Sequence, residues 1–297
     1  MFSVVIPVYN KQDFISKCLE SVKNKNYNDL EMIIVNDGSK DNSLYLINKF
    51  KIDNPNIDIT VLDIENKGVS YARNLGISKC KYDFICFLDA DDYWFDTHLS
   101  NIQLLIKDFP DAHVFCSGFT IRKNNKKDVI KVCDIKRGYV SNFFESSIKN
   151  DIITSSTVCI EKECFSNISF PEGVTLTEDL YVWVYLALNF DIAYDKSITV
   201  VVNQFEDNSR LKRYTQLPYV VWFYHRSSNS SLIKYISYVA FSHLYAFKLN
   251  KNIKNYLKLM LITFKINKYL FFISIFIFFL PCWMIIFLKK FKSIILK

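Results

Sequence analysis

Short apolar runs alternate with amphipathic stretches through the first ninety residues of the chain. Continuous apolar runs such as Phe2–Val8 (FSVVIPV) are typical of strands that are buried on both faces. The stretches between them place apolar residues at every third or fourth position, which indicates helices. The pattern predicts strands at 2–8, 30–35, 57–62 and 83–88, and helices at 11–23, 43–51 and 69–80.

This alternation predicts repeated strand–helix–strand units and therefore a mostly parallel sheet. In open sheets of this kind, ligands bind beyond the carboxyl ends of the strands. We expect the four polar loops after these strands to converge there and to form a nucleotide-type pocket. No glycine-rich dinucleotide motif follows the first strand and no Walker A sequence is present, which disfavours a dinucleotide enzyme and a P-loop NTPase. The four loops are Tyr9-Asn10, Asn36–Ser39, Asp63–Gly68 and Asp89–Asp92.

After residue 92 the pattern continues less regularly. Thr177 precedes an amphipathic stretch and is predicted to be the N-cap of a helix at 180–188. The other predicted elements are a helix at 98–108, strands at 112–120 and 193–203, and an extended segment at 151–160.

Charge divides the chain into two unlike parts. The first 207 residues carry 22 basic and 30 acidic side chains, whereas residues 208–297 carry fifteen basic side chains and no acidic one. Basic segments favour nucleic acid or anionic membrane surfaces. Because this tail is also strongly apolar, it favours a membrane. The acidic edge of the predicted pocket disfavours nucleic acid.

Eight cysteines are spread along the chain, with no CxxC pair and no histidine at zinc-finger spacing. Several lie inside apolar runs, where a thiol behaves as a small hydrophobic group. The N-terminal residues lack the basic and apolar segments of a signal peptide. We therefore expect a reduced, cytoplasmic environment and no structural metal cluster.

Three carboxylates occupy four consecutive positions directly after the fourth strand, in Asp89-Ala90-Asp91-Asp92. Like charges this close raise one another's pKa unless a cation lies among them. A divalent metal is one solution, because Mg²⁺ and Mn²⁺ bind one or two carboxylates together with substrate phosphates. A turn or the acidic first turn of a helix is the other. The convergence of four polar loops favours the metal.

Five blocks of sequence resemble the family 2 glycosyltransferases of the GT-A fold, in order across about the first 210 residues. The resemblance implies an α/β, Rossmann-like fold of the nucleotide-diphospho-sugar transferase type with a mostly parallel sheet. It also implies inverting transfer of a hexose from a UDP-sugar, with Mn²⁺ or Mg²⁺ as cofactor. The blocks are FSVVIPVYN at 2–10, IIVNDGSKD at 33–41, ENKGVSYARNLG at 65–76, FLDADD at 87–92 and TEDLYVW at 177–183.

The resemblance further implies roles for residues on the donor side. Asp37 matches the acidic residue that accepts a hydrogen bond from the uracil ring. Asn66 and Arg73 match the block that faces the ribose and the diphosphate. The residues that match the loop lining the base are Pro7, Val8 and Tyr9.

The DxD motif of the family matches Asp89, Ala90 and Asp91. In the family, one aspartate of this pair contacts the ribose and the other coordinates the metal that bridges the diphosphate. We assign Asp91 and Asp89 as metal ligands and place Asp89 and Ala90 beside the nucleotide sugar. Asp92 stays without an assigned role, since it could share in binding the metal.

The acidic pair Glu178-Asp179 matches the family's residues beside the acceptor. An acceptor hydroxyl must lose its proton as the new bond forms, and a nearby carboxylate can take that proton. Asp179 is the candidate base. Asn36 stands where the family often carries a further aspartate, and no Gln-x-x-Arg-Trp motif of the processive synthases is present. Transfer of one sugar per acceptor is therefore predicted.

The chain divides into a catalytic domain at 1–210, a basic amphipathic helical region at 211–267 and a hydrophobic membrane-anchoring segment at 268–297. Within the last, Tyr269–Leu288 holds twenty uncharged residues, which at about 1.5 Å per residue could cross the ~30 Å bilayer core. Pro281 would kink or break a helix there. Because lysines flank both ends, a re-entrant segment fits as well as a full span.

The resemblance to non-processive enzymes of O-antigen, lipopolysaccharide and capsule assembly implies an enzyme at the cytoplasmic face of the inner membrane. Its predicted partners are a UDP-sugar donor, preferably UDP-glucose, a saccharide acceptor on undecaprenyl diphosphate, and membrane lipids, but no nucleic acid. Two alternatives stay open: direct transfer to polyprenyl phosphate, and a catalytically inactive, membrane-bound scaffold of the same fold. Intact carboxylates at every matching position disfavour the scaffold.

Overall fold

The computed structural model of the chain describes residues 1–23, 29–123, 128–204, 215–226, 229–281 and 284. It divides into two compact units. The first comprises Met1–Ser141, Asn150–Gly173 and Val182–Glu206, and the second comprises Asn142–Lys149, Val174–Tyr181 and Asp207–Lys297. The predicted boundary at residue 210 and most of the predicted anchor beyond Pro281 lie outside the described residues.

The first unit is built on one mixed, mostly parallel sheet, which confirms the predicted α/β class. The strand order is β3-β2-β1-β4-β9-β6-β10-β5, with β7 beside β6 and β8 beside β10. The strands are β1 (Phe2–Val8), β2 (Leu30–Asp37), β3 (Asp58–Ile64), β4 (Phe84–Phe87), β5 (Tyr93–Trp94), β6 (Val114–Lys123), β7 (Val129–Lys131), β8 (Arg137–Tyr139), β9 (Val158–Glu161) and β10 (Ile192–Gln204).

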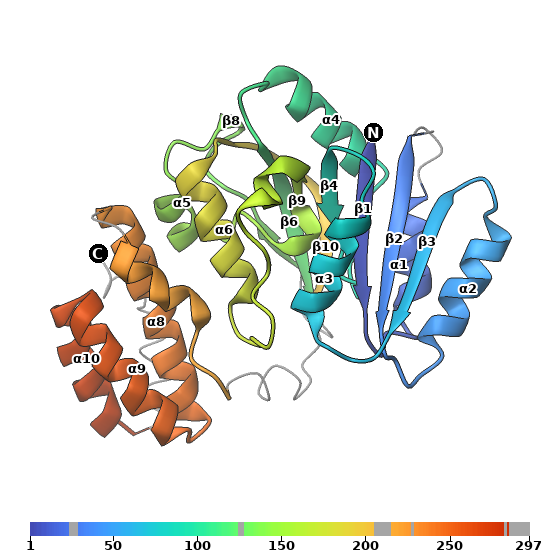
Figure 1. Cartoon of the computed structure of the whole chain (residues 1–297). Coiled ribbons are helices and arrows are strands. Elements are labelled where there is room, and N and C mark those ends of the chain that lie inside the picture. The colour runs from blue at the N-terminus through green and yellow to red at the C-terminus, as the bar shows by residue number, and fades with distance from the viewer. Residues whose placement is uncertain (24–28, 124–127, 205–214, 227–228, 282–283, 285–297) are drawn as a thin grey trace. The chain divides into compact units, whose positions relative to one another are not determined.

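Strands β1 to β4 run parallel to one another, so their carboxyl ends lie at one edge of the sheet (Figure 1). Strand β9 is antiparallel to both of its neighbours, β4 and β6, whereas β10 is parallel to β6. Strands β2 and β3 continue to Asp37 and Ile64, which pair with each other. Asp37 is therefore the last residue of a strand, where the sequence predicts a turn.

Helices cover both faces of this sheet. Along β1, the side chains of Val4, Ile6 and Val8 pack into a core that includes residues of α1, α2 and α4, whereas α3 packs on β1 and β2. The helices that contribute to the first unit are α1 (Ile15–Val22), α2 (Ser43–Asp53), α3 (Val69–Lys79), α4 (His98–Asp108) and part of α6 (Glu178–Asn189), with 3-10 helices η1 (Ser155–Thr157) and η2 (Lys162–Ser166).

Gly76 allows α3 to approach β1 closely. A Cβ atom at this position would lie only 2.4 Å from Cγ1 of the buried Val5. The alanine variant Gly76→Ala must therefore push α3 and β1 apart, and we expect its free energy of unfolding to fall by about 1–3 kcal/mol. Urea denaturation measures this change.

The double variant Gly76→Ala/Val5→Ala is the control for this contact. If the clash with Val5 causes the loss, the double variant loses less stability than the sum of the two single variants. Strict additivity would exclude this contact as the cause.

The second unit is helical, and asparagine side chains begin three of its helices. Asn229, Asn252 and Asn267 each accept hydrogen bonds from backbone N–H groups of the first turn, at α8, α9 and α10 respectively. Asparagine is among the most favourable N-cap residues. The helices are α5 (Phe143–Lys149), α8 (Ser230–Leu249), α9 (Ile253–Ile266) and α10 (Lys268–Phe279), with the 3-10 helix η3 (Tyr219–Arg226).

Helix α10 occupies the first half of the predicted membrane span and ends at Phe279, two residues before Pro281. Leu280 has the extended backbone (ψ 143°) that a residue before proline favours. Across the described residues, none of the helices has both the length and the apolar character needed to cross a bilayer. The second half of the predicted span lies mostly outside the described residues. The seven cysteines in the described part are buried and free of disulfides.

Candidate active site

Loops that follow β1 and β2 are joined by hydrogen bonds at the carboxyl edge of the sheet. The backbone N–H of Asn10 donates to Ser39 Oγ at 3.0 Å, and Asn10 Oδ1 accepts from the backbone N–H of Lys40 at 2.7 Å. Lys11 N–H donates to Ser43 Oγ at 2.8 Å. Tyr9, the first residue after β1, is 47% exposed and therefore accessible to a ligand.

Asp37 holds the loop between β3 and α3. Its carboxylate is buried and accepts backbone N–H groups from Lys67 at 2.7 Å and Gly68 at 2.9 Å. Asn66 Nδ2 donates to the Asp37 carbonyl at 3.0 Å. Gly38 (φ 70°) allows this contact, since a Cβ there would lie 2.8 Å from the backbone nitrogen of Asn66. Because a carboxylate has about four acceptor sites, Asp37 keeps acceptor capacity for a further N–H donor.

The two aspartates of the DxD motif each face a basic side chain. Arg73 Nη2 lies 2.8 Å from Asp89 Oδ1, and Lys11 Nζ lies 2.6 Å from Asp91 Oδ2. Arg73 is buried and its guanidinium lies 5.2 Å from the ring centroid of Phe170, which restricts its orientation. The edge of the sheet therefore carries two carboxylates and two cations side by side.

Asp92 has different partners and joins two segments that are distant from it in the sequence. Its carboxylate accepts a hydrogen bond from Ser156 Oγ at 2.6 Å and from the backbone N–H of Asn203 at 2.8 Å. Asn203 Nδ2 in turn donates to the Asp91 carbonyl at 2.5 Å. Burial, followed by the charges of Asp89 and Asp91, raises the pKa of Asp92 well above its usual value. These contacts give Asp92 a structural role.

We expect Asp92→Ala to lower the free energy of unfolding by about 2–4 kcal/mol, because it leaves the buried Ser156 hydroxyl and the half-buried Asn203 N–H without their acceptor. The variant Asp92→Asn keeps one acceptor oxygen and is expected to cost about 1 kcal/mol. Urea denaturation of both variants at neutral pH tests this order, and equal losses would contradict it.

The pH dependence of Asp92→Asn gives a second measure. The pKa of Asp92 is higher in the folded chain than in the unfolded chain, so protonation of this carboxyl contributes to the free energy of unfolding. The whole contribution is present below the unfolded pKa of about 4, and it is lost as pH rises through the folded pKa. The asparagine side chain has no such dependence. The stability of Asp92→Asn relative to the unsubstituted chain should therefore improve as pH rises from about 4 to 7.

Asp89 and Asp91 fit a divalent metal. Their side chains are 36% and 24% exposed, so they are accessible, whereas Asp92 is committed to Ser156 and Asn203. Each already attracts a cation, and two carboxylates together with substrate phosphates are the usual ligands of Mg²⁺. The ammonium group of Lys11 forms an ion pair with the Asp91 carboxylate and would have to move when a metal binds there.

Three of the predicted donor-side residues are buried rather than accessible. The side chains of Pro7, Val8 and Ala90 lie in the core, so they could meet a ligand only through their backbone atoms. Asn36 is also buried, and its Nδ2 donates to Asp63 Oδ1 at 2.7 Å on the neighbouring strand. The amide of Asn36 therefore joins β2 to β3.

The predicted acceptor-side pair belongs to the second unit. Glu178 is buried, and Asp179 Oδ1 accepts the backbone N–H of Leu180 at 2.7 Å. Thr177 precedes the helix, as predicted, but Val220 N–H donates to its Oγ1 at 3.2 Å, where a capping side chain would accept from the first turn of α6. Its φ of 61° is strained for a β-branched residue.

Sequence reasoning missed three residues at this edge: Lys11, Ser156 and Asn203. Lys11 lies in a loop without a motif, and Ser156 and Asn203 are more than sixty residues from the aspartates that they contact. Ser156 also accepts Asp89 N–H on Oγ at 3.2 Å. No local pattern in the sequence could have indicated these contacts.

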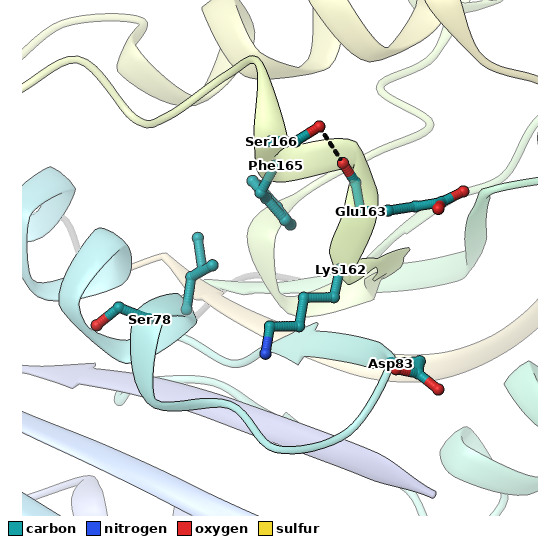
Figure 2. A pocket seen from close by; sticks show the side chains of 7 residues that line it. Ser78, Asp83, Lys162, Glu163, Phe165 and Ser166 are labelled. Atoms are coloured by element: carbon teal, nitrogen blue, oxygen red, sulfur yellow. Dashed lines mark hydrogen bonds between the residues drawn. The ribbon is translucent and has the colours of Figure 1, made fainter.

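A separate hollow of about 470 Å³ lies at the other end of β4. Asp83 precedes this strand, whereas Asp89 follows it, so the hollow is remote from the acidic edge. Figure 2 shows Lys162, Glu163 and Phe165 around it. Glu163 also lies near His113, with Oε1 3.9 Å from the imidazole Nε2. The hollow therefore contributes nothing to the candidate site.

Comparison with known proteins identifies the family. The sequence profile of Glycosyl transferase family 2 matches residues 3–162, which is more than half of the chain. The chain belongs to this family. The matched segment runs from β1 through β9 and includes Asp37, Arg73, Asp89 and Asp91.

Several curated relatives are similar to this chain over more than half of its length. One relative is the "putative teichuronic acid biosynthesis glycosyltransferase TuaG" of Bacillus subtilis. It is 25% identical over 76% of this chain and 87% of that protein. WfaP of Escherichia coli, a UDP-Glc:α-D-GlcNAc-diphosphoundecaprenol β-1,3-glucosyltransferase, is 30% identical over 62% of this chain and 69% of that protein. An uncharacterized glycosyltransferase of Rickettsia bellii is 32% identical, but the match spans only 26% of its length.

Solved structures show the same fold. TarS 1–349 of S. aureus superposes with a TM-score of 0.71 over 91% of this chain and 82% of that chain, at 16% identity. The mannosyltransferase PcManGT of Pyrobaculum calidifontis, solved with GDP-Man and Mn²⁺, superposes with a TM-score of 0.52 over 92% and 73%, at 15% identity. At these identities the likeness establishes a GT-A-like fold and nothing finer.

Proposed function

We propose that the family 2 enzyme described here transfers a hexose from a UDP-sugar, preferably UDP-glucose, to a saccharide on undecaprenyl diphosphate, with inversion and with Mn²⁺ or Mg²⁺. The reaction would take place at the cytoplasmic face of the inner membrane during assembly of a bacterial surface polysaccharide. One observation carries the donor assignment: Asp37, Asp89, Asp91, Arg73 and Lys11 gather at the carboxyl edge of a parallel sheet.

The residues at this edge divide between the two ends of a nucleotide sugar. Asp37 is suited to accept the N–H of a uracil ring, and the exposed ring of Tyr9 can cover the base. Arg73 and Lys11 supply positive charge for a diphosphate, and a buried, oriented arginine suits bidentate contact with phosphate oxygens.

Asp89 and Asp91 would hold the metal, which when bound supplies a Lewis acid for the leaving diphosphate. Release of Lys11 from Asp91 leaves its ammonium group free to contact a phosphate oxygen. Asp92 takes no part in this exchange and keeps the loop in place through Ser156 and Asn203. Charge that develops on the departing UDP would thus meet the buried, oriented Arg73 and the released ammonium group of Lys11.

Asp179 is proposed as the base. Attack of an acceptor hydroxyl on the anomeric carbon forms one C–O bond, breaks the bond to UDP and releases one proton, which the carboxylate accepts. Direct displacement of this kind inverts the anomeric centre. Glu178, the neighbouring acid, is buried and is proposed to bind the acceptor rather than to take the proton.

The lipid-linked acceptor is inferred from two independent features. WfaP, which is 30% identical over 187 residues, uses an acceptor on diphosphoundecaprenol according to its name. The tail of this chain has fifteen basic residues and no acidic one from residue 208 onwards, which suits anionic lipid. Because the Gln-x-x-Arg-Trp motif is absent from the sequence, we propose that one sugar is added per acceptor.

A donor panel tests the proposal. Membranes that contain the protein are incubated with Mn²⁺, a synthetic GlcNAc-diphosphoundecaprenol and labelled UDP- or GDP-sugars. We expect label in the lipid fraction with a UDP-hexose and none with GDP-sugars. Transfer to polyprenyl phosphate without any saccharide would instead support a lipid-phosphate glycosyltransferase. Failure to bind UDP together with Mn²⁺ would support an inactive scaffold.

A further inference from the structure

Two packed helices of the second unit expose an unusual amount of large apolar surface. The exposed residues recur at intervals of three or four, so each set forms one row along its helix. Their side chains are between 39% and 78% exposed. The apolar face consists of Ile253, Leu257, Leu261 and Phe264 on α9 and Tyr269, Phe272, Phe276 and Phe279 on α10.

Helix α10 is apolar around almost its whole circumference. One side, with Leu270, Ser274 and Ile277, is buried, and Tyr256 of α9 donates to the Ser274 carbonyl at 2.5 Å. The opposite side carries the exposed aromatic row. A helix that is apolar on all sides is normally buried in protein or in lipid, so its open side requires a covering surface.

Lysines border this apolar face. Lys254, Lys258 and Lys265 are exposed on α9 beside the apolar row, and the Nζ of Lys268 lies 5.9 Å from the ring of Phe264. Exposed apolar and aromatic residues bordered by lysines are typical of helices that lie in a membrane interface. The long lysine stems can reach the headgroups while the apolar residues enter the acyl region.

We propose that the apolar face docks on an anionic bilayer, with α9 and α10 lying in the plane of one leaflet. Helix α10 has twelve residues and is about 18 Å long, which is too short for the ~30 Å hydrocarbon core. This proposal rests on the membrane location in the proposed function and deepens it: the described part of the tail binds the surface and does not cross it.

A second copy of the chain is the main rival occupant. Pairing of two such faces would bring Lys254, Lys258, Lys265 and Lys268 of one copy close to the same residues of the other. The sequence from residue 208 onwards contains no acidic side chain that could neutralise them. Lipid phosphates supply the complementary charge, so the charges favour a membrane over a copy of the chain.

Vesicle flotation of the full-length chain tests the docking. We expect binding to vesicles of phosphatidylglycerol and phosphatidylcholine, and much weaker binding to phosphatidylcholine alone. The triple variant F272S/F276S/F279S should bind the mixed vesicles at least about 100-fold more weakly, because each phenylalanine contributes independently to partition. The quadruple variant K254Q/K258Q/K265Q/K268Q should lose the preference for anionic lipid.

Tyr45, Ile52 and Leu104 provide a matched control, since they are three exposed large apolar residues on α2 and α4 of the first unit. The variant Y45S/I52S/L104S should bind vesicles like the unsubstituted chain. Circular dichroism and UDP binding show whether the F272S/F276S/F279S variant is folded. Unchanged flotation of a folded F272S/F276S/F279S variant would overturn the proposal.

Light scattering, which measures the oligomeric state, tests whether a second copy of the chain covers the apolar face. A dimer that F272S/F276S/F279S converts to a monomer, without any vesicle binding by the unsubstituted chain, would assign the face to chain–chain contact and overturn docking. Flotation needs neither donor nor acceptor. A failed docking therefore leaves the proposed reaction untouched, and a failed transfer assay leaves the docking result intact.

Discussion

Asp91→Ala is expected to lower kcat by at least about 100-fold, because it removes a carboxylate that we assign to the metal beside the leaving diphosphate. Asp91 is accessible and already neutralises Lys11 at 2.6 Å. Its loss should also weaken Mn²⁺ binding in the presence of UDP, as measured by isothermal titration calorimetry. Transfer of labelled sugar to the lipid acceptor gives the rate.

The variant Lys11→Met distinguishes loss of a metal ligand at Asp91 from loss of the ion pair between Lys11 and Asp91. This variant breaks the same contact with Asp91 but keeps the carboxylate. If Asp91 is a metal ligand, Lys11→Met should bind Mn²⁺ at least as tightly as the unsubstituted chain in the absence of nucleotide, because a competing cation is gone. Full activity and unchanged Mn²⁺ affinity in Asp91→Ala would exclude Asp91 as a ligand.

Asp179→Asn is expected to lower kcat by about 10²–10⁴-fold with little change in KM for the UDP-sugar, since it removes the proposed proton acceptor. The asparagine keeps an Oδ1 atom for the Leu180 N–H, so the first turn of α6 should stay folded. The acidic limb of the pH profile of kcat, which reports ionisation of the base, should disappear in this variant.

Glu178→Gln is the matched control, because it removes the neighbouring charge and leaves Asp179 in place. We expect a higher KM for the acceptor and an intact acidic limb. The reverse pattern, with the limb lost in Glu178→Gln and kept in Asp179→Asn, would make Glu178 the base. Full turnover by Asp179→Asn would remove this residue from the chemistry.

The sequence predicted the large elements of the first unit because buried parallel strands leave a strong local signal. The runs that became β1, β2 and β4 are mostly apolar, and polar residues follow each run within two positions. Strands β5, β7 and β8 have only two or three residues each and show no periodicity that could reveal them. Helix α5 was missed for a similar reason, since seven residues make barely two turns.

The acidic edge shows where sequence reasoning ends. Asp91 and Asp92 are identical side chains at adjacent positions, so composition and spacing cannot separate them. The fold separates them, because Asp92 faces Ser156 and Asn203 while Asp91 faces Lys11. Each of these partners comes from another part of the chain, and only tertiary structure brings them together.

Thr177 is a second case of this kind. The sequence predicted a helix at 180–188 after Thr177, and α6 begins two residues earlier, at Glu178. The direction of its side chain depends instead on the backbone N–H of Val220, which is 43 residues away. The positive φ of Thr177 has no signature in the sequence, since glycine or asparagine would be the usual residue there.

The hydrogen bond from Asn203 to Asp92 determines when the acidic edge can form during synthesis. A chain is synthesised from its N-terminus and can begin to fold during synthesis. The four loops at the carboxyl ends of β1 to β4 all lie within the first hundred residues, so they emerge from the ribosome early. Asp92 gains its last partner only when Asn203 pairs β10 beside β6, 111 residues later. A nascent or truncated chain that ends before β10 contains every residue of the DxD motif but lacks the Asn203 contacts to Asp91 and Asp92, so we expect it to bind UDP and Mn²⁺ much more weakly than the chain with β10.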